Sequence, residues 1–368
     1  MKKAIWIYWL IMLTSILLFG KDTLELSFLG DIMAHDVNFK MPDYNLIYAH
    51  VKEILANDDL TFGNLEFPIV ENLPFTTYPR FNVKASYVRA ARQASIEVFS
   101  LANNHTLDQG VAGVVETLAS IIKLKEEFNG ELYYSGIRGS QNKDFKPATI
   151  FRQGFKIGFL AITEFSNILP TNGLVYMVNY HNKNEAQQFI NWLRTVCSEY
   201  DLFIVSVHAG IEYQLKPSKS KASFFREMVQ AGVTIVWGHH PHVLQPYEVI
   251  EVAGCQRLIM HSLGNFISGQ TAFLRPQDYN LERAYTGDSA IIQVTVKRNA
   301  LGQASVADVR PVLISTYKTS PHNYYIVALT ESLASQVLPD GWQKFFQARY
   351  QVIRDFFKRK EEFLPPLE

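Results

Sequence analysis

Residues 233–242 read Val-Thr-Ile-Val-Trp-Gly-His-His-Pro-His, an apolar run that ends in three histidines. The run Val233–Trp237 is short and rich in β-branched residues, which predicts a buried strand. Imidazoles left unpaired beside a core cost free energy, and metal binding is the usual way to satisfy such a cluster. This stretch therefore predicts a strand that delivers histidine ligands at its carboxyl end.

Short apolar runs alternate with helical patterns through most of the chain. Strands are predicted at Leu24–Leu29, Leu60–Phe62, Ile96–Leu101, Phe155–Ile162, Leu202–Val207, Val233–Trp237 and Leu258–His261. Helices are predicted at Asn45–Ala56, Ser86–Ala94, Val111–Phe128, Glu185–Cys197 and Ser220–Gln230. This alternation is typical of an α/β domain. After Ala290 the pattern turns strand-rich, and Trp342, Phe346, Tyr350, Ile353 and Phe357 mark an amphipathic C-terminal helix.

Several predicted strands end in side chains that bind metals well. These side chains are Asp31, Glu66, Asn104 with His105, His208 and the histidines of 239–242. Ligands in open α/β sheets bind beyond the carboxyl ends of strands, so we expect these side chains to meet at one rim. Oxygen and nitrogen ligands without thiolate suit zinc, manganese or iron, and two ions can share a bridging carboxylate.

Each piece also has an ordinary structural explanation. Gly30-Asp31 can be a turn, Glu66 a surface residue and His208 a core histidine. Asn103-Asn104 can cap a helix. The metal hypothesis depends on all the pieces occurring together, each at the end of a predicted strand.

The ordered motifs resemble the CapA family of capsule and poly-γ-glutamate synthesis proteins, a branch of the calcineurin-like metallophosphatase superfamily. The matching segments are Gly30–Met33, Gly63–Glu66, Ala102–His105, His208–Tyr213, Gly238–Gln245 and Ser262–Phe266. The resemblance implies a four-layer α/β/β/α sandwich with a dinuclear metal site at its rim. It divides the chain into a metallophosphatase-like domain at 21–270 and a C-terminal extension of strands and an amphipathic helix at 271–368.

The resemblance also implies roles for individual residues. The implied ligands of two divalent ions (Mn, Fe or Zn) are Asp31, Glu66, Asn104, His208, His240 and His242. Glu66 resembles the bridging carboxylate. His239 is an alternative within the final pair, because the superfamily's Gly-His-x-His pattern is one residue longer here. His105 resembles the catalytic histidine that donates a proton to the leaving oxygen.

The chain departs from the superfamily pattern at two positions. Met33 stands where the superfamily's first motif has histidine, and His35 is a weak candidate to replace it. Glu66 stands where the superfamily normally has Asp. Both differences put ordinary phosphatase activity in doubt. Arg80 and Glu212 are further candidates for binding substrate, with a surface ion pair as the alternative for each.

The N-terminus predicts export. Lys2 and Lys3 precede an apolar stretch, Ala4–Phe19, which reads as a secretory signal or signal anchor at residues 1–20. The stretch is short of the ~20 residues of a transmembrane helix, so cleavage and anchoring both remain open. We expect a periplasmic or extracytoplasmic protein.

Composition narrows the class. The 368 residues carry 35 basic and 35 acidic side chains, and this zero balance argues against a nucleic-acid partner. Hydrophobic residues make up 48 %, which indicates a globular chain with a sizeable core. Cys197 and Cys255 cannot make a Cys-based zinc site; two buried thiols are favoured over a disulfide.

These observations leave three functional hypotheses. The first is a dinuclear-metal-dependent hydrolase of the envelope that acts on a phosphoester or an amide of an anionic polymer. The second is a non-enzymatic assembly or export component of a membrane-bound synthesis complex, with a structural metal site. The third, a carbohydrate- or peptide-binding module, draws only on the 13 % aromatic content, most of which is expected to be core.

Overall fold

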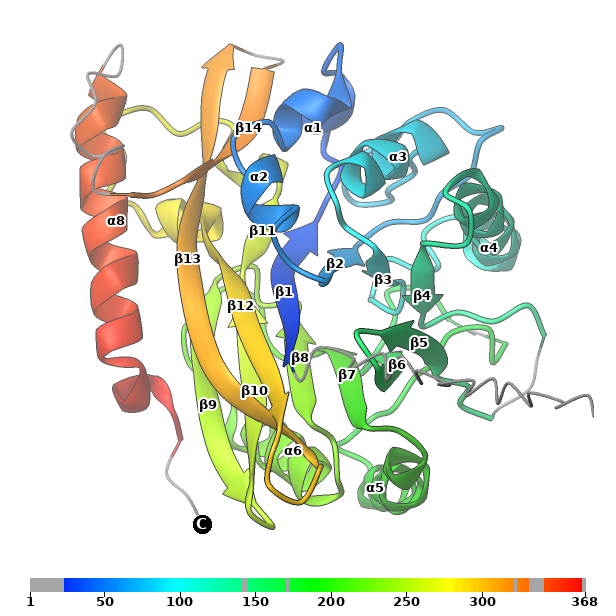
Figure 1. The fold of residues 1–368 in the computed structure, drawn as a ribbon. Helices are drawn as coiled ribbons and strands as arrows, with labels where there is room; N and C mark the ends of the chain where they lie inside the picture. Colours follow the sequence, from blue (N-terminus) through cyan, green and yellow to red (C-terminus); the bar gives the residue numbers. More distant parts are fainter. Residues whose placement is uncertain (1–22, 141–143, 170–171, 321–322, 331–340, 366–368) are drawn as a thin grey trace, which may run out of the picture.

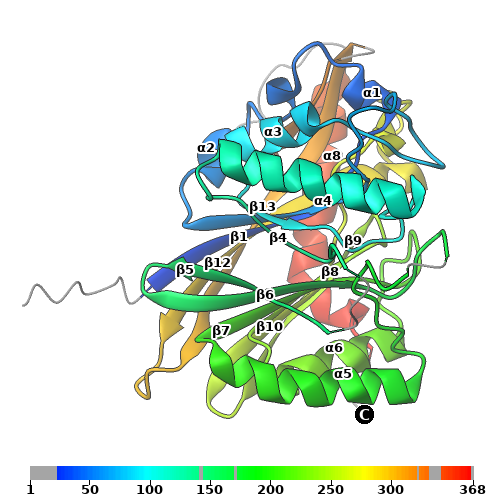
Figure 2. The same cartoon turned by 90° about the vertical axis from the view of Figure 1, so that its right-hand side faces the viewer.

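The computed structural model describes residues 23–140, 144–169, 172–320, 323–330 and 341–365. Two β-sheets pack face to face, and helices cover the outer face of each (Figures 1 and 2). The predicted four-layer α/β/β/α arrangement is confirmed. The predicted export segment, residues 1–20, lies outside the described residues. Among the helices of the described ranges, none is long and apolar enough to cross a membrane.

The first sheet has the strand order β14-β13-β12-β1-β2-β3-β4, and β11 also pairs with β1. The strands are β1 (Thr23–Ile32), β2 (Leu60–Leu65), β3 (Val98–Ser100), β4 (Tyr133–Ser135), β11 (Asn265–Ile267), β12 (Asp288–Arg298), β13 (Ala304–Ser320) and β14 (Asn323–Ala328). Strands β1 to β4 run parallel, whereas β12, β13 and β14 are antiparallel. The predicted C-terminal strands therefore continue the sheet that contains β1.

The second sheet has the order β5-β6-β7-β8-β10-β9. Its strands are β5 (Ala148–Arg152), β6 (Phe155–Thr163), β7 (Leu202–His208), β8 (Ile235–His239), β9 (Leu244–Val252) and β10 (Cys255–Leu263). The four central strands are parallel, and β5 and β9 pair antiparallel at the two edges. Parallel strands place their carboxyl ends at one edge of the sheet, where a site can form.

Helices cover both outer faces. Helices α3 (Ala85–Gln93) and α4 (Gly110–Glu127) cover the first sheet, and α5 (Lys183–Val196) and α6 (Lys219–Gln230) cover the second (Figure 2). Asn182 caps the N-terminus of α5, because its side-chain oxygen accepts the backbone N–H groups of Asn184 and Glu185. Its buried residues recur at helical spacing and are Phe189, Ile190, Leu193 and Val196. Helix α8 (Trp342–Lys358) packs along β13 and β12 and buries Phe345, Phe346 and Ile353.

Aromatic residues join the two sheets. Phe28 of β1 stacks on Phe62 of β2, and both rings pack against Trp237 of β8 in the opposite sheet. The Trp237 indole N–H donates to the carbonyl of Leu29 at 2.9 Å. All these side chains are fully buried. This contact holds the carboxyl ends of β1 and β8 close together.

The structure corrects one predicted helix. Asn45–Ala56 is not continuous but forms a 3₁₀ turn, η1 (Tyr44–Ile47), and a short α2 (Lys52–Leu55). Between these two elements, hydrogen bonds such as that from Val51 N–H to the Tyr48 carbonyl join residues that are three apart rather than four. This spacing is that of a 3₁₀ helix, which is tighter than an α-helix. The prediction of a continuous helix was wrong. The spacing of the buried residues fits a continuous helix and also a 3₁₀ turn followed by a short helix, so the spacing alone could not distinguish them.

The two cysteines are unpaired. Cys255 is buried and Cys197 is partly buried, and both are free thiols. The favoured prediction of two separate thiols is therefore confirmed, although Cys197 is less buried than expected.

Candidate metal centre

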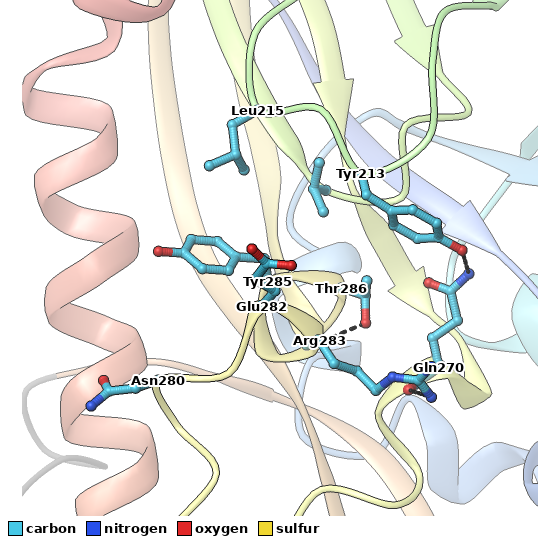
Figure 3. Close-up of a pocket in the computed structure, with 9 residues that line it drawn as sticks. Tyr213, Leu215, Gln270, Asn280, Glu282, Arg283, Tyr285 and Thr286 are labelled. Atoms are coloured by element: carbon cyan, nitrogen blue, oxygen red, sulfur yellow. Dashed lines mark hydrogen bonds between the residues drawn. The ribbon is translucent and has the colours of Figure 1, made fainter.

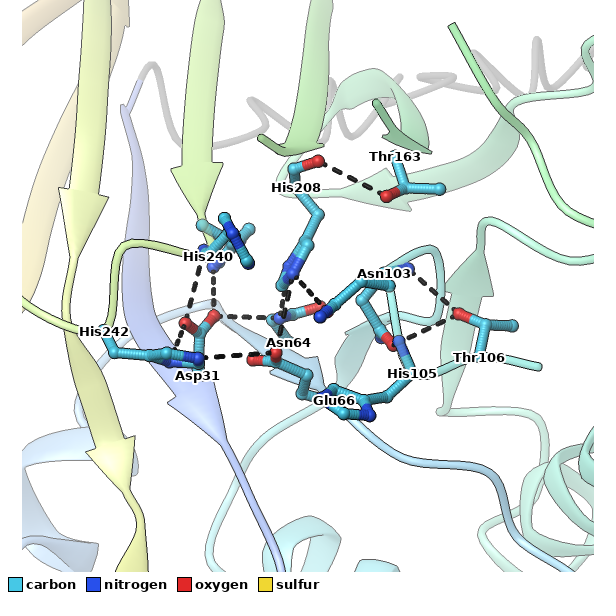
Figure 4. Close-up of polar contacts among 12 residues, drawn as sticks. Asp31, Asn64, Glu66, Asn103, His105, Thr106, Thr163, His208, His240 and His242 are labelled. Atoms are coloured by element: carbon cyan, nitrogen blue, oxygen red, sulfur yellow. Dashed lines mark hydrogen bonds and ion pairs between the residues drawn. The ribbon is translucent and has the colours of Figure 1, made fainter. Parts of the chain in front are cut away.

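The strand ends of both sheets meet at one buried cluster (Figure 4). Asp31 lies near the end of β1 and pairs in register with Asn64 of β2. His208 ends β7 and pairs in register with His239 of β8. Glu66 directly follows β2, and the turn after β8 carries two more histidines. The fold thus brings residues from four strands to one point between the sheets.

Asp31 is surrounded by donors. Its Oδ1 accepts the Asn64 amide at 2.9 Å and lies 3.0 Å from His239 Nδ1. Its Oδ2 accepts the backbone N–H of His240 at 3.3 Å and lies 3.4 Å from His242 Nδ1. Burial alone raises the pKa of this carboxyl, but the contacts with His239 and His242 outweigh burial and hold the pKa well below its usual value. Asp31 is therefore a carboxylate with a fixed orientation.

Glu66, unlike Asp31, has no hydrogen-bond donor at its carboxylate. It is fully buried, yet neither of its carboxylate oxygens has a hydrogen-bond partner. Its Oε1 lies 3.5 Å from His208 Nε2 and 3.8 Å from His242 Nε2. Burial and the nearby charge of Asp31 raise its pKa well above the usual value. A buried carboxylate without donors is costly unless a cation compensates it, so the donor set fits a metal site.

Two groups of potential ligands share this carboxylate. Asp31, Glu66 and His208 form one group, and Glu66, His240 and His242 form the other; within each, the ligand atoms lie within 4.8 Å of one another. Burial lowers the pKa of His208 well below its usual value and that of His240 to about 3. Both imidazoles are therefore neutral, which is the form that binds metals.

Further unsatisfied atoms surround the two groups. His239 Nε2, His240 Nδ1 and Asn64 Oδ1 are buried without hydrogen-bond partners. The Asn104 side-chain oxygen lies 2.8 Å from His208 Nε2, so these two potential ligand atoms face the same space. His239, the alternative in the final histidine pair, turns its Nδ1 to Asp31 rather than joining either group.

The turn after β8 has an unusual backbone. His240 has φ 93° and His242 has φ 58°, conformations that favour glycine over other residues. Strained non-glycine residues persist where surrounding structure holds them, and they gather at functional sites. Asn265 supplies part of that restraint, because its Oδ1 lies 3.0 Å from His242 Nδ1. A proton on Nδ1 directed at Asn265 leaves His242 Nε2 facing Glu66.

His105 lies beside the cluster in a pair with Asp108. His105 Nδ1 is 2.7 Å from Asp108 Oδ2, and both residues are buried. The same carboxylate oxygen accepts the backbone N–H of Phe81 at 2.7 Å, and the Phe81 ring packs on the imidazole edge-on at 4.7 Å. With Nδ1–H directed at Asp108, the other ring nitrogen of His105 is available to a reacting group.

The remaining predicted residues lie outside the cluster. Arg80 is exposed in the loop that carries Phe81, and its backbone carbonyl accepts the Thr76 hydroxyl. Glu212 is also exposed, but its charge contributes to raising the pKa of Glu66. His35 accepts the Gly269 N–H at Nδ1, at 3.0 Å, and belongs to neither ligand group.

Three participants received no role in the sequence analysis: Asn64, Asp108 and Asn265. Asn64 lies in the matching segment Gly63–Glu66 and Asn265 in Ser262–Phe266. Their place in these segments was the available signal. Asp108 follows His105 by three residues, the spacing of one helical turn, and that spacing was its only signal.

Comparison with known proteins identifies the family. Residues 25–270 match the family model described as bacterial capsule synthesis protein PGA_cap. The chain belongs to this family. The matched residues include every member of both ligand groups, so the cluster lies within the part of the chain that defines the PGA_cap family.

Curated relatives agree with this membership. The chain is 28 % identical over 320 residues to the capsule biosynthesis protein CapA of Bacillus anthracis. This match covers 82 % of this chain and 70 % of the relative. It is 27 % identical over 305 residues to the PGA biosynthesis protein CapA of Bacillus subtilis, covering 79 % and 72 %.

Solved structures with a similar fold include nucleotidases. The NAD nucleotidase of Haemophilus influenzae matches with 13 % identity and a TM-score of 0.45, over 90 % of this chain and 60 % of that one. A putative 5'-nucleotidase of Staphylococcus aureus matches with 10 % identity and a TM-score of 0.47, over 91 % and 58 %. This chain thus spans about 60 % of the length of these nucleotidases.

Proposed function

We propose that this PGA_cap family member is a dinuclear-metal-dependent hydrolase that acts on a phosphoester or an amide of an anionic polymer in capsule synthesis. The observation that carries the proposal is Glu66, a buried carboxylate with two unsatisfied oxygens that is shared by two ligand groups. Family membership supports a role in capsule biosynthesis. It also supports the proposed location outside the cytoplasm and a membrane-bound synthesis complex as partner.

The two ligand groups support a division of the ligand roles. Glu66, His240 and His242 would hold one ion, and Asp31, Glu66 and His208 would hold the other, with Asn104 beside His208 as a further ligand. When bound, two divalent ions would supply a nucleophile by lowering the pKa of water and would stabilise the charge of the reacting group. Asn64 orients Asp31, and Asn265 orients His242. Burial of all these side chains keeps bulk water from competing with substrate.

His105 would be the general acid. Asp108 accepts Nδ1–H and, as a carboxylate, stabilises the doubly protonated ring, whose second N–H would pass its proton to the leaving oxygen or nitrogen. Phe81 packs on the ring and keeps it in this orientation. Arg80, in the same loop, and Glu212, after β7, are the proposed contacts to the substrate outside the cluster.

The test combines metal loading with hydrolysis. The full chain, stripped with chelator and reloaded with Mn²⁺, Zn²⁺ or Fe²⁺, should hydrolyse a generic phosphodiester or a γ-linked oligoglutamate. Glu66→Ala should abolish turnover, whereas Glu53→Ala, on the exposed surface of α2, should leave it unchanged. Equal hydrolysis in wild type and Glu66→Ala would contradict the proposal. Bound metal without hydrolysis of any substrate would favour the non-enzymatic assembly role instead.

A further inference from the structure

Lys221 of α6 is a buried cation near the candidate metal centre. It is fully buried, and its Nζ donates to the Ala209 carbonyl at 2.9 Å, the His261 carbonyl at 2.9 Å and the Gln245 side-chain oxygen at 3.2 Å. All three partners act as acceptors, so each of the three protons of an ammonium group has its own partner. None of the three partners is a carboxylate.

A buried ammonium that contacts only neutral groups costs free energy. Burial lowers the pKa of Lys221 to about 7, against the smaller opposing effect of the charges of Glu164 and Asp31. An apolar side chain of similar volume would fill the same place at lower cost. The buried charge and its three hydrogen bonds therefore indicate a specific task for this side chain.

The three hydrogen bonds of Lys221 connect three strands of the second sheet, on whose outer face α6 lies (Figure 2). Ala209 directly follows β7, His261 lies in β10 and Gln245 lies in β9. In this sheet β8 lies between β7 and β10. Lys221 thus joins both neighbours of β8, the strand that leads into residues 239–242, which we call the histidine turn.

Lys221 and Gln245 together restrain residues 209–214, which we call the post-β7 loop. Gln245 accepts from Lys221 through Oε1 and donates through Nε2 to the Gln214 carbonyl at 2.8 Å. Lys221 therefore holds the first residue of the loop and Gln245 holds the last. Between them, Tyr213 is exposed and forms part of the wall of a pocket of about 710 Å³ (Figure 3). With open space on this side, the loop relies on the hydrogen bonds at its two ends.

The post-β7 loop in turn contacts the histidine turn through backbone hydrogen bonds. The Ala209 N–H donates to the His239 carbonyl at 3.2 Å, and the Tyr213 N–H donates to the Pro241 carbonyl at 2.8 Å. These bonds lie near the two ends of the loop, where Lys221 and Gln245 hold it. A displacement of the loop would therefore displace the histidine turn.

The histidine turn needs such external restraint. His240 and His242 both have positive φ, a strained conformation that persists only where the surrounding structure holds it. Their imidazoles form one ligand group with Glu66. The restraint supplied through the loop therefore acts on one of the two groups of potential metal ligands.

We propose that Lys221 is a positioning residue of the metal centre, which acts through the post-β7 loop to fix the histidine turn. In this role it keeps His240 and His242 in place to bind an ion with Glu66. The inference rests on the proposed metal centre but not on the proposed hydrolysis.

The two ligand groups should respond differently to the loss of Lys221. His208, in the other group, lies within β7 and pairs in register with β6 on one side and β8 on the other. Asp31, in the same group, accepts hydrogen bonds that do not involve the post-β7 loop. The ion held by Asp31, Glu66 and His208 should therefore be affected less than the ion held by the histidine turn.

Metal titration tests this role without reference to activity. The full chain is stripped with chelator and titrated with Mn²⁺ by isothermal calorimetry. Lys221→Met keeps an unbranched side chain but removes the charge and all three hydrogen bonds. It should weaken the binding of one of the two ions by about tenfold or more, the usual effect of losing a residue that supports metal ligands, and leave the other ion unchanged. Electron paramagnetic resonance at two equivalents of Mn²⁺ should show a coupled pair of ions in wild type and isolated Mn²⁺ in the variant.

Two further variants separate positioning from a general loss of stability. Met228→Ala removes a buried apolar side chain from the same helix, so it should lower the melting temperature but bind both ions as wild type does. Gln245→Met removes the donor to the Gln214 carbonyl and should weaken the same ion as Lys221→Met. Gln245→Met also provides the test if Lys221→Met does not fold.

The outcomes separate this proposal from the proposed function. Unchanged affinity for both ions in the folded Lys221→Met and Gln245→Met variants would overturn the positioning role and leave the metal centre standing. Tighter binding in Lys221→Met would also overturn it, because repulsion between the ammonium and the ions would then outweigh positioning. A wild-type chain that binds two ions but hydrolyses no substrate, and whose Lys221→Met variant loses one ion, would support the role and remove the catalytic claim. A folded wild-type chain that binds no metal would overturn the centre and the positioning role together.

Discussion

Glu66 is the residue on which the candidate metal centre depends. Its neighbour Asp31 has donors on both oxygens, whereas Glu66 has none, although both are fully buried. The difference indicates that protein groups orient the Asp31 carboxylate, whereas no protein group compensates the Glu66 carboxylate, which supports the proposal that Glu66 binds a cation. Glu66 is the first residue after β2, and its long side chain places the carboxylate near the other members of both ligand groups.

Asp108 should matter for turnover but not for metal binding. Asp108→Asn keeps an acceptor for the Phe81 N–H but weakens the orientation of His105. We expect kcat to fall by about 10²-fold, the lower range for general acid catalysis, with KM and bound metal unchanged. Steady-state kinetics with metal analysis checks this, and Asp36→Asn, an exposed aspartate, is the control. A normal kcat in Asp108→Asn would remove Asp108 from the mechanism.

Asp58 should make stability depend on pH. Burial raises the pKa of Asp58 from 3.8 to about 7, so the folded state keeps a proton that the unfolded state has released. The stabilisation from this group is complete below about pH 4 and is lost as the pH rises to about 7. The difference in the free energy of unfolding, Asp58→Asn minus wild type, should therefore be at least about 1 kcal/mol more positive at about pH 8 than at about pH 4. Urea unfolding at both pH values measures it; an equal difference at both would contradict the shift.

The sequence predicted which side chains gather in the candidate cluster better than it predicted their contacts. Asp31, Glu66, His208 and the histidines of the β8 turn could be named because each lies at or just after the end of a recognisable strand. Their contacts could not, since Asn64 meets His208 across 144 residues and His239 meets Asp31 across 208. Such contacts depend on the stacking of two sheets, which no local pattern encodes.

At the scale of elements, the end of β8 depends on close backbone contact. A Cβ atom on Gly238 would lie 2.2 Å from the His261 carbonyl oxygen of β10, a backbone atom that cannot move alone. Gly238→Ala should lower the free energy of unfolding by at least about 2 kcal/mol. Gly139→Ala, at an exposed position whose nearest neighbour is a flexible leucine side chain, should be nearly neutral in the same urea titration. Equal stability of the two variants would contradict this packing.

Elements with strong periodicity were predictable, whereas elements that are very short or lie at a sheet edge with weak alternation were not. The central strands β6, β7 and β10 and helices α4 and α6 lie where apolar periodicity placed them. Strand β11 has three residues and β9 alternates buried with exposed positions only weakly, so neither has a clear local signal. The broken helix at 45–56 shows that periodicity records which face is buried, not which helix type forms.

At the scale of the molecule, helix α8 is attached to the first sheet. Arg349 is buried and pairs with Asp288 at the start of β12. Arg349→Met leaves that carboxylate buried without its cation, which should cost about 3–5 kcal/mol of unfolding free energy.

Arg359→Met tests whether this effect is specific to the buried pair. Arg359 pairs with Glu362 on the surface after the same helix, so its loss should leave the melting temperature unchanged. Differential scanning calorimetry of both variants provides the comparison. Similar melting temperatures for Arg349→Met and wild type would show that the Arg349–Asp288 pair does not stabilise the packing of α8 on the sheet.

The central claim is that Glu66 unites two metal sites between the sheets. Its most direct test is metal analysis by mass spectrometry of the folded full chain after reloading and removal of free metal. The account predicts two divalent ions in each wild-type chain, and fewer than one in each Glu66→Ala chain with its circular dichroism unchanged. A folded wild-type chain that retains no metal, or a Glu66→Ala chain that retains both ions, would contradict it.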